Sequence, residues 1–141
     1  MSTWIVDVDG TLALRGLRGP YDWSRVGEDK PNRPVIELVQ ALAAAGHEII
    51  VVSGRMDCCC AQTAQWLLDH KVPFSQLHMR ETGDRAPDAM VKSEILQAIW
   101  ETMEADEKQD EPLRVIDDRQ QCVDMWRTQG LFCAQVAKGD F

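Results

Sequence analysis

The sequence predicts an α/β fold: a doubly wound, mostly parallel, Rossmann-like sheet of five strands, with helices on both faces. Short apolar, β-branched segments alternate with longer amphipathic segments along the 141 residues, and several of the apolar segments end in carboxylates. Alternating strands and helices favour parallel pairing through right-handed crossovers. Ligands of such sheets bind beyond the carboxyl ends of the strands. We therefore expect residues 1–141 to form one domain with its site at that edge.

Two strands and two helices are predicted in the first half of the chain. Residues 4–8 (WIVDV) and 48–53 (EIIVVS) are short apolar runs typical of buried parallel strands. Residues 34–45 place apolar side chains at helical spacing, with a proline in the first turn, and therefore predict a helix. Residues 59–70 predict a second helix, which ends before Pro73.

The second half of the chain continues this alternation with weaker signals. The predicted elements are a strand at 74–79, a polar loop at 80–87, a helix at 92–103 opened by Lys92, a strand from 114, a helix at 120–129 and a final strand at 131–136. Gly130 favours the end of the last helix. The acidic segment 101–111 is expected to be a solvated tail of the helix before it.

One insertion interrupts the pattern. Residues 14–33 follow the first strand and are rich in glycine, arginine and aromatic residues. Because they begin just after an acidic pair, we expect them to form a small flap over the site, with no large cap. Within the flap, Tyr21 and Trp23 could stack on a terminal base or serve only in packing.

The chain is acidic. It contains 15 Lys and Arg residues and 23 Asp and Glu residues, which gives a formal charge of −8 and a pI near 4.8. Proteins that neutralise many phosphates of a duplex are usually basic, so the charge argues against a long nucleic-acid footprint. A site for one terminal phosphate remains compatible with it. The basic residues that could form a local rim are Arg15, Arg18, Arg25, Arg55, Arg80, Arg85 and Lys92.

Hydropathy and cysteine usage favour a cytoplasmic, intracellular protein. No apolar run approaches the roughly 20 residues of a membrane span. The first residues lead into a strand without an apolar leader. Cys58, Cys59 and Cys60 are consecutive and form a poor disulfide framework. We expect reduced structural thiols there, with a metal or redox cluster as the alternative.

The first chemical motif is DVDGT at 7–11. Asp7 and Asp9 are two residues apart, so an extended backbone would direct both carboxylates to one side. Paired carboxylates require a cation or a proton between them, and hard oxygen ligands favour Mg²⁺. An ionised aspartate can also attack phosphorus, while a protonated carboxyl group protonates the leaving oxygen. The alternative is an ordinary turn rich in Asp and Gly.

Two further motifs contain basic groups. Ser53, Gly54 and Arg55 follow the second strand, where a hydroxyl, backbone N–H groups and a guanidinium could clamp a phosphate. Lys92 follows Asp88, and its ammonium could neutralise phosphoryl charge. Taken alone, these residues could equally be a helix cap and surface side chains.

The last motif is Asp117-Asp118 at the end of the fourth predicted strand. Beside the first acidic pair, these carboxylates would complete a cation site. The alternative is a solvated turn. The order of all four motifs, each at a strand end or near a helix start, favours the interpretation as one site.

In this order the motifs resemble those of the haloacid dehalogenase superfamily of aspartate-nucleophile phosphohydrolases. Further segments are similar to the 3′-phosphatase domain of phage-type polynucleotide kinase/phosphatase: 18–22 (RGPYD), 51–55 (VVSGR), 79–84 (MRETGD), 125–127 (MWR) and 135–141 (QVAKGDF). That family removes 3′-phosphates, in some cases 2′,3′-cyclic phosphates, from nucleic-acid ends. The sequence contains no G-x-x-x-x-G-K-[ST] loop, so 5′-kinase activity is not expected.

The resemblance implies a role for each matching residue. Asp7 would be the nucleophile, and Asp9 would be the general acid and then the base. The implied metal ligands are Asp7, Asp9 (through its backbone carbonyl), Asp118 as the main carboxylate and Asp117 nearby. The implied phosphate- or substrate-binding residues are Arg18, Ser53, Gly54, Arg55, Asp88 and Lys92.

The resemblance therefore implies a Mg²⁺-dependent phosphatase that acts on DNA or RNA 3′ ends and does not bind membranes. A small-molecule, nucleotide-like phosphatase of the same superfamily and a non-catalytic binding module are the alternatives. The sequence is compatible with a homo-oligomer, with a separate kinase or ligase partner and with a phage origin.

Overall fold

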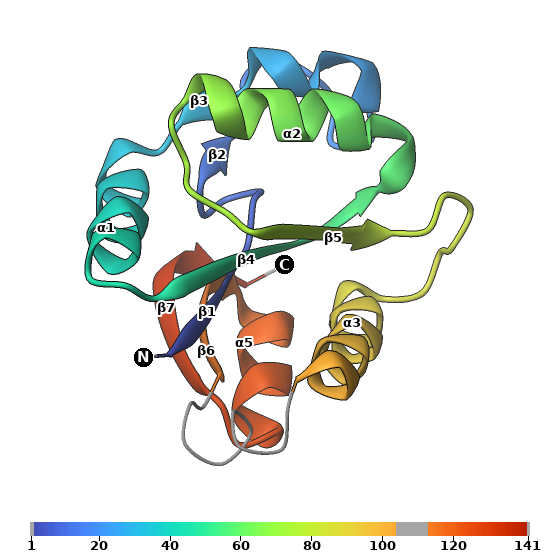
Figure 1. The fold of residues 1–141 in the computed structure, drawn as a ribbon. Coiled ribbons are helices and arrows are strands. Elements are labelled where there is room, and N and C mark those ends of the chain that lie inside the picture. Colours follow the sequence, from blue (N-terminus) through green and yellow to red (C-terminus); the bar gives the residue numbers. More distant parts are fainter. Residues whose placement is uncertain (1, 104–112, 141) are drawn as a thin grey trace.

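The computed structural model describes residues 2–103 and 113–140. Its centre is a parallel sheet with the strand order β5-β4-β1-β6-β7 (Figure 1). The strands are β1 (Thr3–Val6), β4 (Glu48–Met56), β5 (Gln76–Arg80), β6 (Leu113–Arg119) and β7 (Phe132–Gly139). The predicted five-stranded parallel sheet is therefore confirmed.

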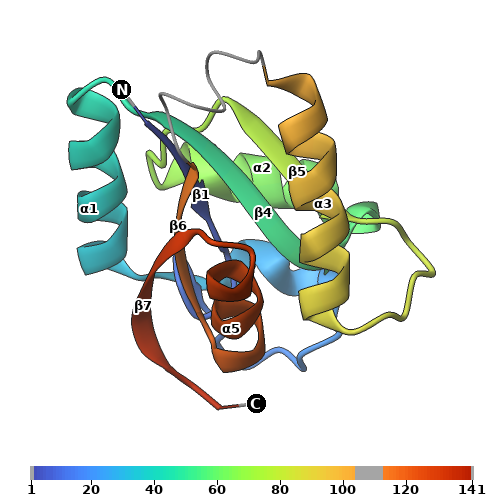
Figure 2. The same ribbon diagram turned by 90° about the horizontal axis from the view of Figure 1, so that it is seen from below.

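Helices cover both faces of this sheet (Figures 1 and 2). They are α1 (Arg33–Ala44), α2 (Cys60–Asp69), α3 (Asp88–Thr102) and α5 (Gln120–Thr128). Buried side chains of α1 and α2 share one apolar cluster, and those of α3 and α5 share another. Strand β1 contributes to both clusters, because Ile5 and Val6 point to opposite faces.

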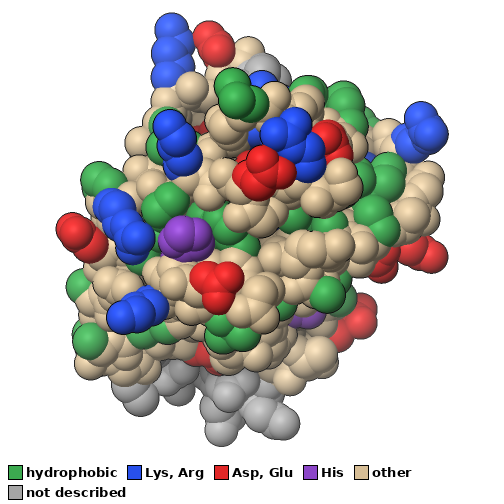
Figure 3. Space-filling view, turned by 90° about the horizontal axis from the view of Figure 1, so that it is seen from above, with side chains coloured by type: hydrophobic (Ala, Val, Ile, Leu, Met, Phe, Trp, Pro, Cys, Tyr) green, Lys and Arg blue, Asp and Glu red, His purple; other side chains and the backbone are tan. Residues whose placement is uncertain are grey.

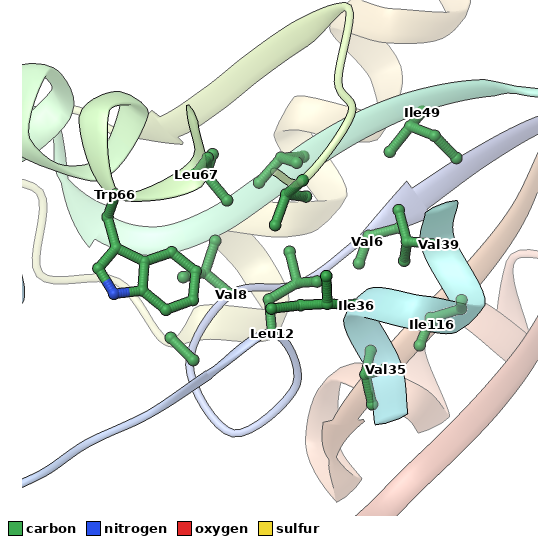
Figure 4. Packing of buried hydrophobic residues seen from close by; sticks show 13 residues of the cluster. Val6, Val8, Leu12, Val35, Ile36, Val39, Ile49, Trp66, Leu67 and Ile116 are labelled. Atoms are coloured by element: carbon green, nitrogen blue, oxygen red, sulfur yellow. The ribbon is translucent and has the colours of Figure 1, made fainter. Parts of the chain in front are cut away.

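The apolar cluster under α1 and α2 lies next to the DVDGT motif. Val8 and Leu12 of this motif region pack against Ile36 of α1 and Leu67 of α2 (Figure 4). Full burial of such a side chain contributes about 1.5–3 kcal/mol. The turn that carries the first two aspartates is therefore anchored in the core.

The insertion at 14–33 is closed at its base by a short antiparallel pair, β2 (Ala13–Leu14) with β3 (Lys30–Pro31). Between these strands lies the 3₁₀ turn η1 (Trp23–Glu28), whose Val26 is buried. The insertion lies beside α2 (Figure 1), and Trp66 Nε1 of that helix donates a 2.9 Å hydrogen bond to the Asp29 carbonyl.

Several element boundaries differ from the predictions, and two of these differences lie next to the site. Strand β4 continues beyond Ser53 to Met56, with a shift in its pairing to β5. Helix α3 begins at Asp88, so the prediction that Lys92 opens it is wrong. A carboxylate in the first turn stabilises a helix N-terminus, which favours the earlier start.

Helix α3 ends at Thr102, and the predicted acidic tail lies largely outside the described residues. Among the helices that are described, none has the length and apolar character needed to cross a bilayer.

Candidate active site

The acidic residues of the site lie at the carboxyl ends of two neighbouring strands. Asp7 follows β1 directly, and its backbone N–H donates a 3.0 Å hydrogen bond to the Ile116 carbonyl of β6. Asp117 and Asp118 follow Ile116 in that strand. Parallel pairing of β1 with β6 therefore brings residues separated by 110 positions to one point.

Three buried carboxylates meet there. Oxygens of Asp7, Asp117 and Asp118 all lie within 4.8 Å of one another, and within the described residues this is the one such group of three or more potential metal ligands. Lys92 of α3 enters the same cluster. Its Nζ lies 2.8 Å from Asp7 Oδ1 and 2.9 Å from Asp117 Oδ2.

Charge is unevenly balanced within this cluster. Burial raises the pKa of Asp7 well above its ordinary value, and the nearby Asp117 raises it further. Burial also raises the pKa of Asp118. Burial alone would lower the pKa of Lys92, but Asp7 and Asp117 raise it well above its ordinary value. With the carboxylates ionised, one ammonium group leaves two negative charges unneutralised, which is the charge of one divalent cation.

Asp117 and Asp118 have different surroundings. Asp117 Oδ2 accepts hydrogen bonds from Lys92 Nζ and from Trp126 Nε1 at 3.0 Å, and its Oδ1 accepts the Asp118 N–H at 2.8 Å. Asp118 Oδ1 instead lies 3.1 Å from Thr11 Oγ1, which also lies 3.0 Å from Asp7 Oδ2. Asp117 is thus held by the protein, while Asp118 is better placed to bind a ligand.

Gly10 allows this close approach. Its φ of +80° lies in the left-handed region, and a Cβ at this position would overlap the Asp118 carboxylate. Any other residue would therefore strain the turn and displace Asp118.

Asp9 does not join the carboxylate cluster. Its side chain is 42% exposed and is bound by two guanidinium groups. Arg55 donates from Nε to Asp9 Oδ2 at 3.0 Å and from Nη2 to Oδ1 at 2.8 Å, and Arg18 Nη2 donates to Oδ1 at 3.2 Å. Asp7 and Asp9 therefore face different partners despite their spacing.

Asp29 is buried and accepts hydrogen bonds from the same two arginines. Arg18 Nε donates to its Oδ1 at 2.7 Å, and Arg55 Nη2 donates to its Oδ2 at 2.8 Å. Thr63 of α2 accepts from Arg55 Nη1 at 3.1 Å. The sequence analysis missed Asp29, because its partners Arg18 and Arg55 lie far from it in sequence or in an irregular segment and only the folded structure brings them together.

Asp88 lies in a third group of charged side chains. Arg80 Nη2 and Arg119 Nη1 donate to its two oxygens at 2.6 and 2.7 Å. Burial would raise the pKa of Asp88, but Lys92 and these two arginines lower it below its ordinary value.

Gly54 passes so close that a Cβ would overlap the Asp88 carboxylate. Ser53 Oγ accepts the Arg55 N–H at 3.1 Å.

The expected basic rim is wrong for four of its seven residues, while Arg15, Arg25 and Arg85 are exposed. Arg18, Arg55, Arg80 and Lys92 are buried, because they bind carboxylates or backbone carbonyls inside the protein. Arg25 pairs with Glu28. On the face that carries α2 and η1, charges of both signs are interspersed (Figure 3).

The cysteine segment lies beside this site without joining the carboxylates. Cys58 and Cys60 are exposed, whereas Cys59 is buried and its Sγ lies 3.3 Å from the Met56 carbonyl.

A doubly wound parallel sheet with buried aspartates beyond two adjacent strands matches the haloacid dehalogenase fold expected from the sequence. The family model of the polynucleotide kinase PNKP phosphatase domain matches residues 1–141, and the chain belongs to this family.

Solved structures agree with this assignment. A chain in the structure of a Pnkp1/Rnl/Hen1 complex is 33% identical, with a TM-score of 0.87 over 99% of this chain and 47% of that one. A structure of the Pnkp1/Rnl/Hen1 RNA repair complex matches equally well, with 43% of its chain covered. This chain thus spans less than half the length of those relatives.

A more distant structure shares the fold alone. The D,D-heptose 1.7-bisphosphate phosphatase from B. bronchiseptica, complexed with magnesium and phosphate, is 10% identical. It superposes with a TM-score of 0.61 over 94% of this chain and 79% of that one.

Proposed function

We propose that residues 1–141 act as one domain, a Mg²⁺-dependent polynucleotide 3′-phosphatase that works through an aspartyl-phosphate. The observation that carries the proposal is the position of the buried Asp7 carboxylate, between Lys92 and Asp118 at the edge of the sheet. A 2′,3′-cyclic phosphate end is a related substrate.

The buried cluster fits a magnesium ion. All its donors are carboxylate oxygens, which hard cations prefer, and its excess negative charge matches a divalent cation. Asp7 and Asp118 would hold the ion, with Asp117 nearby and the Asp9 carbonyl as a further ligand. When bound, it would supply Lewis-acid stabilisation of phosphoryl charge.

Asp7 would attack phosphorus as the bond from phosphorus to the 3′-oxygen breaks. Asp9 would give its proton to the departing oxygen, and it would later take a proton from the water that hydrolyses the aspartyl-phosphate. Lys92 would offset charge on the transferring group. Ser53 and Gly54 would contribute phosphate contacts, while Arg18 and Arg55 would orient Asp9.

The likeness to chains of an RNA repair complex supports polynucleotide ends as the substrate. The segment at 14–33 is a small flap in this proposal and leaves room for a polymer end. A kinase or ligase on a separate chain is a compatible partner.

The test uses a 3′-phosphorylated oligonucleotide, as DNA and as RNA, with Mg²⁺ or with EDTA. We expect phosphate release with Mg²⁺ and none with EDTA. In the Asp7→Asn protein the rate of release should fall by at least about 10³-fold, because the nucleophile is removed. Circular dichroism checks that this variant is folded. Faster turnover of aryl phosphates than of oligonucleotides would indicate a small-molecule phosphatase. No Mg²⁺-dependent turnover of any phosphomonoester would indicate a binding module.

A further inference from the structure

We propose that Tyr21 and Trp23 form a stacking platform for the base of the terminal nucleotide. The proposal rests on the polynucleotide function above and assigns the insertion a specific role. These two residues would recognise the substrate, whereas the proposed catalytic residues lie at the carboxyl ends of the strands.

Trp23 is connected to Asp9 through one guanidinium group. The Arg18 Cζ atom lies 5.9 Å from the centroid of the Trp23 ring, in a cation–π contact. The Nη2 atom of the same group lies 3.2 Å from Asp9 Oδ1. Because Asp9 is the proposed acid for the leaving oxygen and its side chain is 42% exposed, the nucleoside that carries this oxygen would lie next to Asp9, on the side where Arg18 contacts it. The Trp23 ring is therefore about one nucleoside away from the bond that breaks.

Tyr21 extends this aromatic surface outward. Its ring meets Trp23 edge to face, with centroids 6.2 Å apart and an interplanar angle of 83°. Tyr21 is 83% exposed, so it does not serve the core of the flap, where Val26 is buried. Because the two rings are nearly perpendicular, a base can stack on only one of them; Tyr21, supported by the half-buried Trp23, offers its exposed ring face to a ligand from solvent.

The charges of the molecule favour a base as the occupant. The net charge is −8, and four of the expected rim cations are buried in internal contacts. Contacts to more than the terminal phosphate are therefore few, and another source of binding energy is needed. Stacking on aromatic rings supplies it without positive charge and with little dependence on base identity.

The experiment measures KM for two oligonucleotides that differ only in the 3′-terminal residue, which is a normal nucleotide or an abasic sugar, both with a 3′-phosphate. We expect Tyr21→Ala to raise KM for the normal end about 5- to 100-fold more than for the abasic end. Tyr21→Phe should restore the difference, because it keeps the ring.

Phe132→Ala is the matched control. Phe132 is also exposed and also meets a tryptophan edge to face, Trp4, with centroids 6.1 Å apart. It is the first residue of β7 and so lies at the amino-terminal end of that strand, whereas the site lies at the carboxyl ends of β1 and β6. We expect this variant to leave both KM values unchanged.

If Tyr21→Ala changed KM equally for the normal and the abasic end, or changed neither, the stacking proposal would be overturned. Turnover by the wild-type protein would in that case still support the phosphatase proposal. If the wild-type protein released no phosphate from either end, the proposed function itself would fail, and the platform with it.

Discussion

Arg18 and Arg55 each bind two carboxylates, Asp9 near the surface and Asp29 below it. When Asp9 is ionised, two guanidinium groups and two carboxylates balance in charge within this group. A phosphate would have to displace one of the carboxylates to gain the same contacts. Positioning of Asp9 is therefore the role that these distances favour for both arginines.

Asp29 is the residue that fixes this arrangement, and Asp29→Asn tests it. We expect kcat to fall about 10- to 100-fold with a small change in KM, because Asp9 loses its orientation while the phosphate contacts remain. Loss of a buried counter-charge should also lower the free energy of unfolding by about 3 kcal/mol. Steady-state kinetics and urea unfolding measure the two effects.

Glu28→Gln is the control for Asp29. This acid lies in the same insertion but is exposed, and among the described residues the ion pair given for it is with Arg25. It should behave as wild type in both measurements. A folded Asp29→Asn protein with unchanged kcat would contradict the positioning role.

Single residues at strand ends were within reach of the sequence. Asp7, Asp117 and Asp118 directly follow apolar runs, so their meeting at one edge follows from parallel pairing. Asp29 could not be predicted from the sequence, because it lies in an irregular segment with no periodic pattern. Its contact with Arg55 exists only because the folded flap packs against α2.

At the scale of elements, strands and helices were predicted by their apolar patterns, while some boundaries depend on single side chains. Arg80 at the end of β5 donates to the carbonyls of Gly54, Asp84 and Ala86, and so fastens the loop before α3. One buried guanidinium thus organises a polar segment whose sequence indicates only a loop.

The N-terminus of α3 should make stability depend on pH through Asp88. The pKa of Asp88 is lower in the folded protein than its ordinary value of 3.8. The ionised carboxylate therefore contributes its full share to the free energy of unfolding above pH 3.8, and this share is lost as the pH falls through the pKa of the folded state. We expect Asp88→Asn to lower the free energy of unfolding by about 1–3 kcal/mol at pH 7. The difference from wild type should shrink towards pH 3.

Urea unfolding at a series of pH values measures this effect. Asp69→Asn is the control, since Asp69 is an exposed aspartate at the end of α2 that bonds only to Gln65 among the contacts described for its carboxylate. It should change stability little at any pH. A difference between Asp88→Asn and wild type that persisted unchanged below pH 3.5 would contradict the assignment.

At the scale of the molecule, the acidic balance has an internal component. Asp7, Asp117 and Asp118 concentrate negative charge in a buried cluster with one lysine, while Arg18, Arg55 and Arg80, three of the arginines expected at the surface, are buried in contacts within the protein. Composition predicted the net charge and argued against a long backbone footprint. It could not reveal which cations were buried, because that depends on partners distant in sequence.

This charge distribution predicts specific stabilisation by Mg²⁺. A cation that binds only the folded state at 100 times its Kd contributes about 2.7 kcal/mol. For a chain of this length the melting temperature should then rise by roughly 10 °C. NaCl at equal ionic strength should raise it much less, because screening of the net charge does not require the buried cluster. Differential scanning fluorimetry measures both shifts.

Asp118→Asn separates the cluster from general salt effects. The variant should lose most of the Mg²⁺ shift, because it replaces the proposed main ligand. Without Mg²⁺ it should melt no lower than wild type, since burial and the nearby Asp117 already disfavour ionised Asp118. Asp69→Asn should keep the full wild-type shift. Equal shifts with Mg²⁺ and NaCl in the wild-type protein, or a full Mg²⁺ shift in Asp118→Asn, would exclude the buried carboxylates as the cation site.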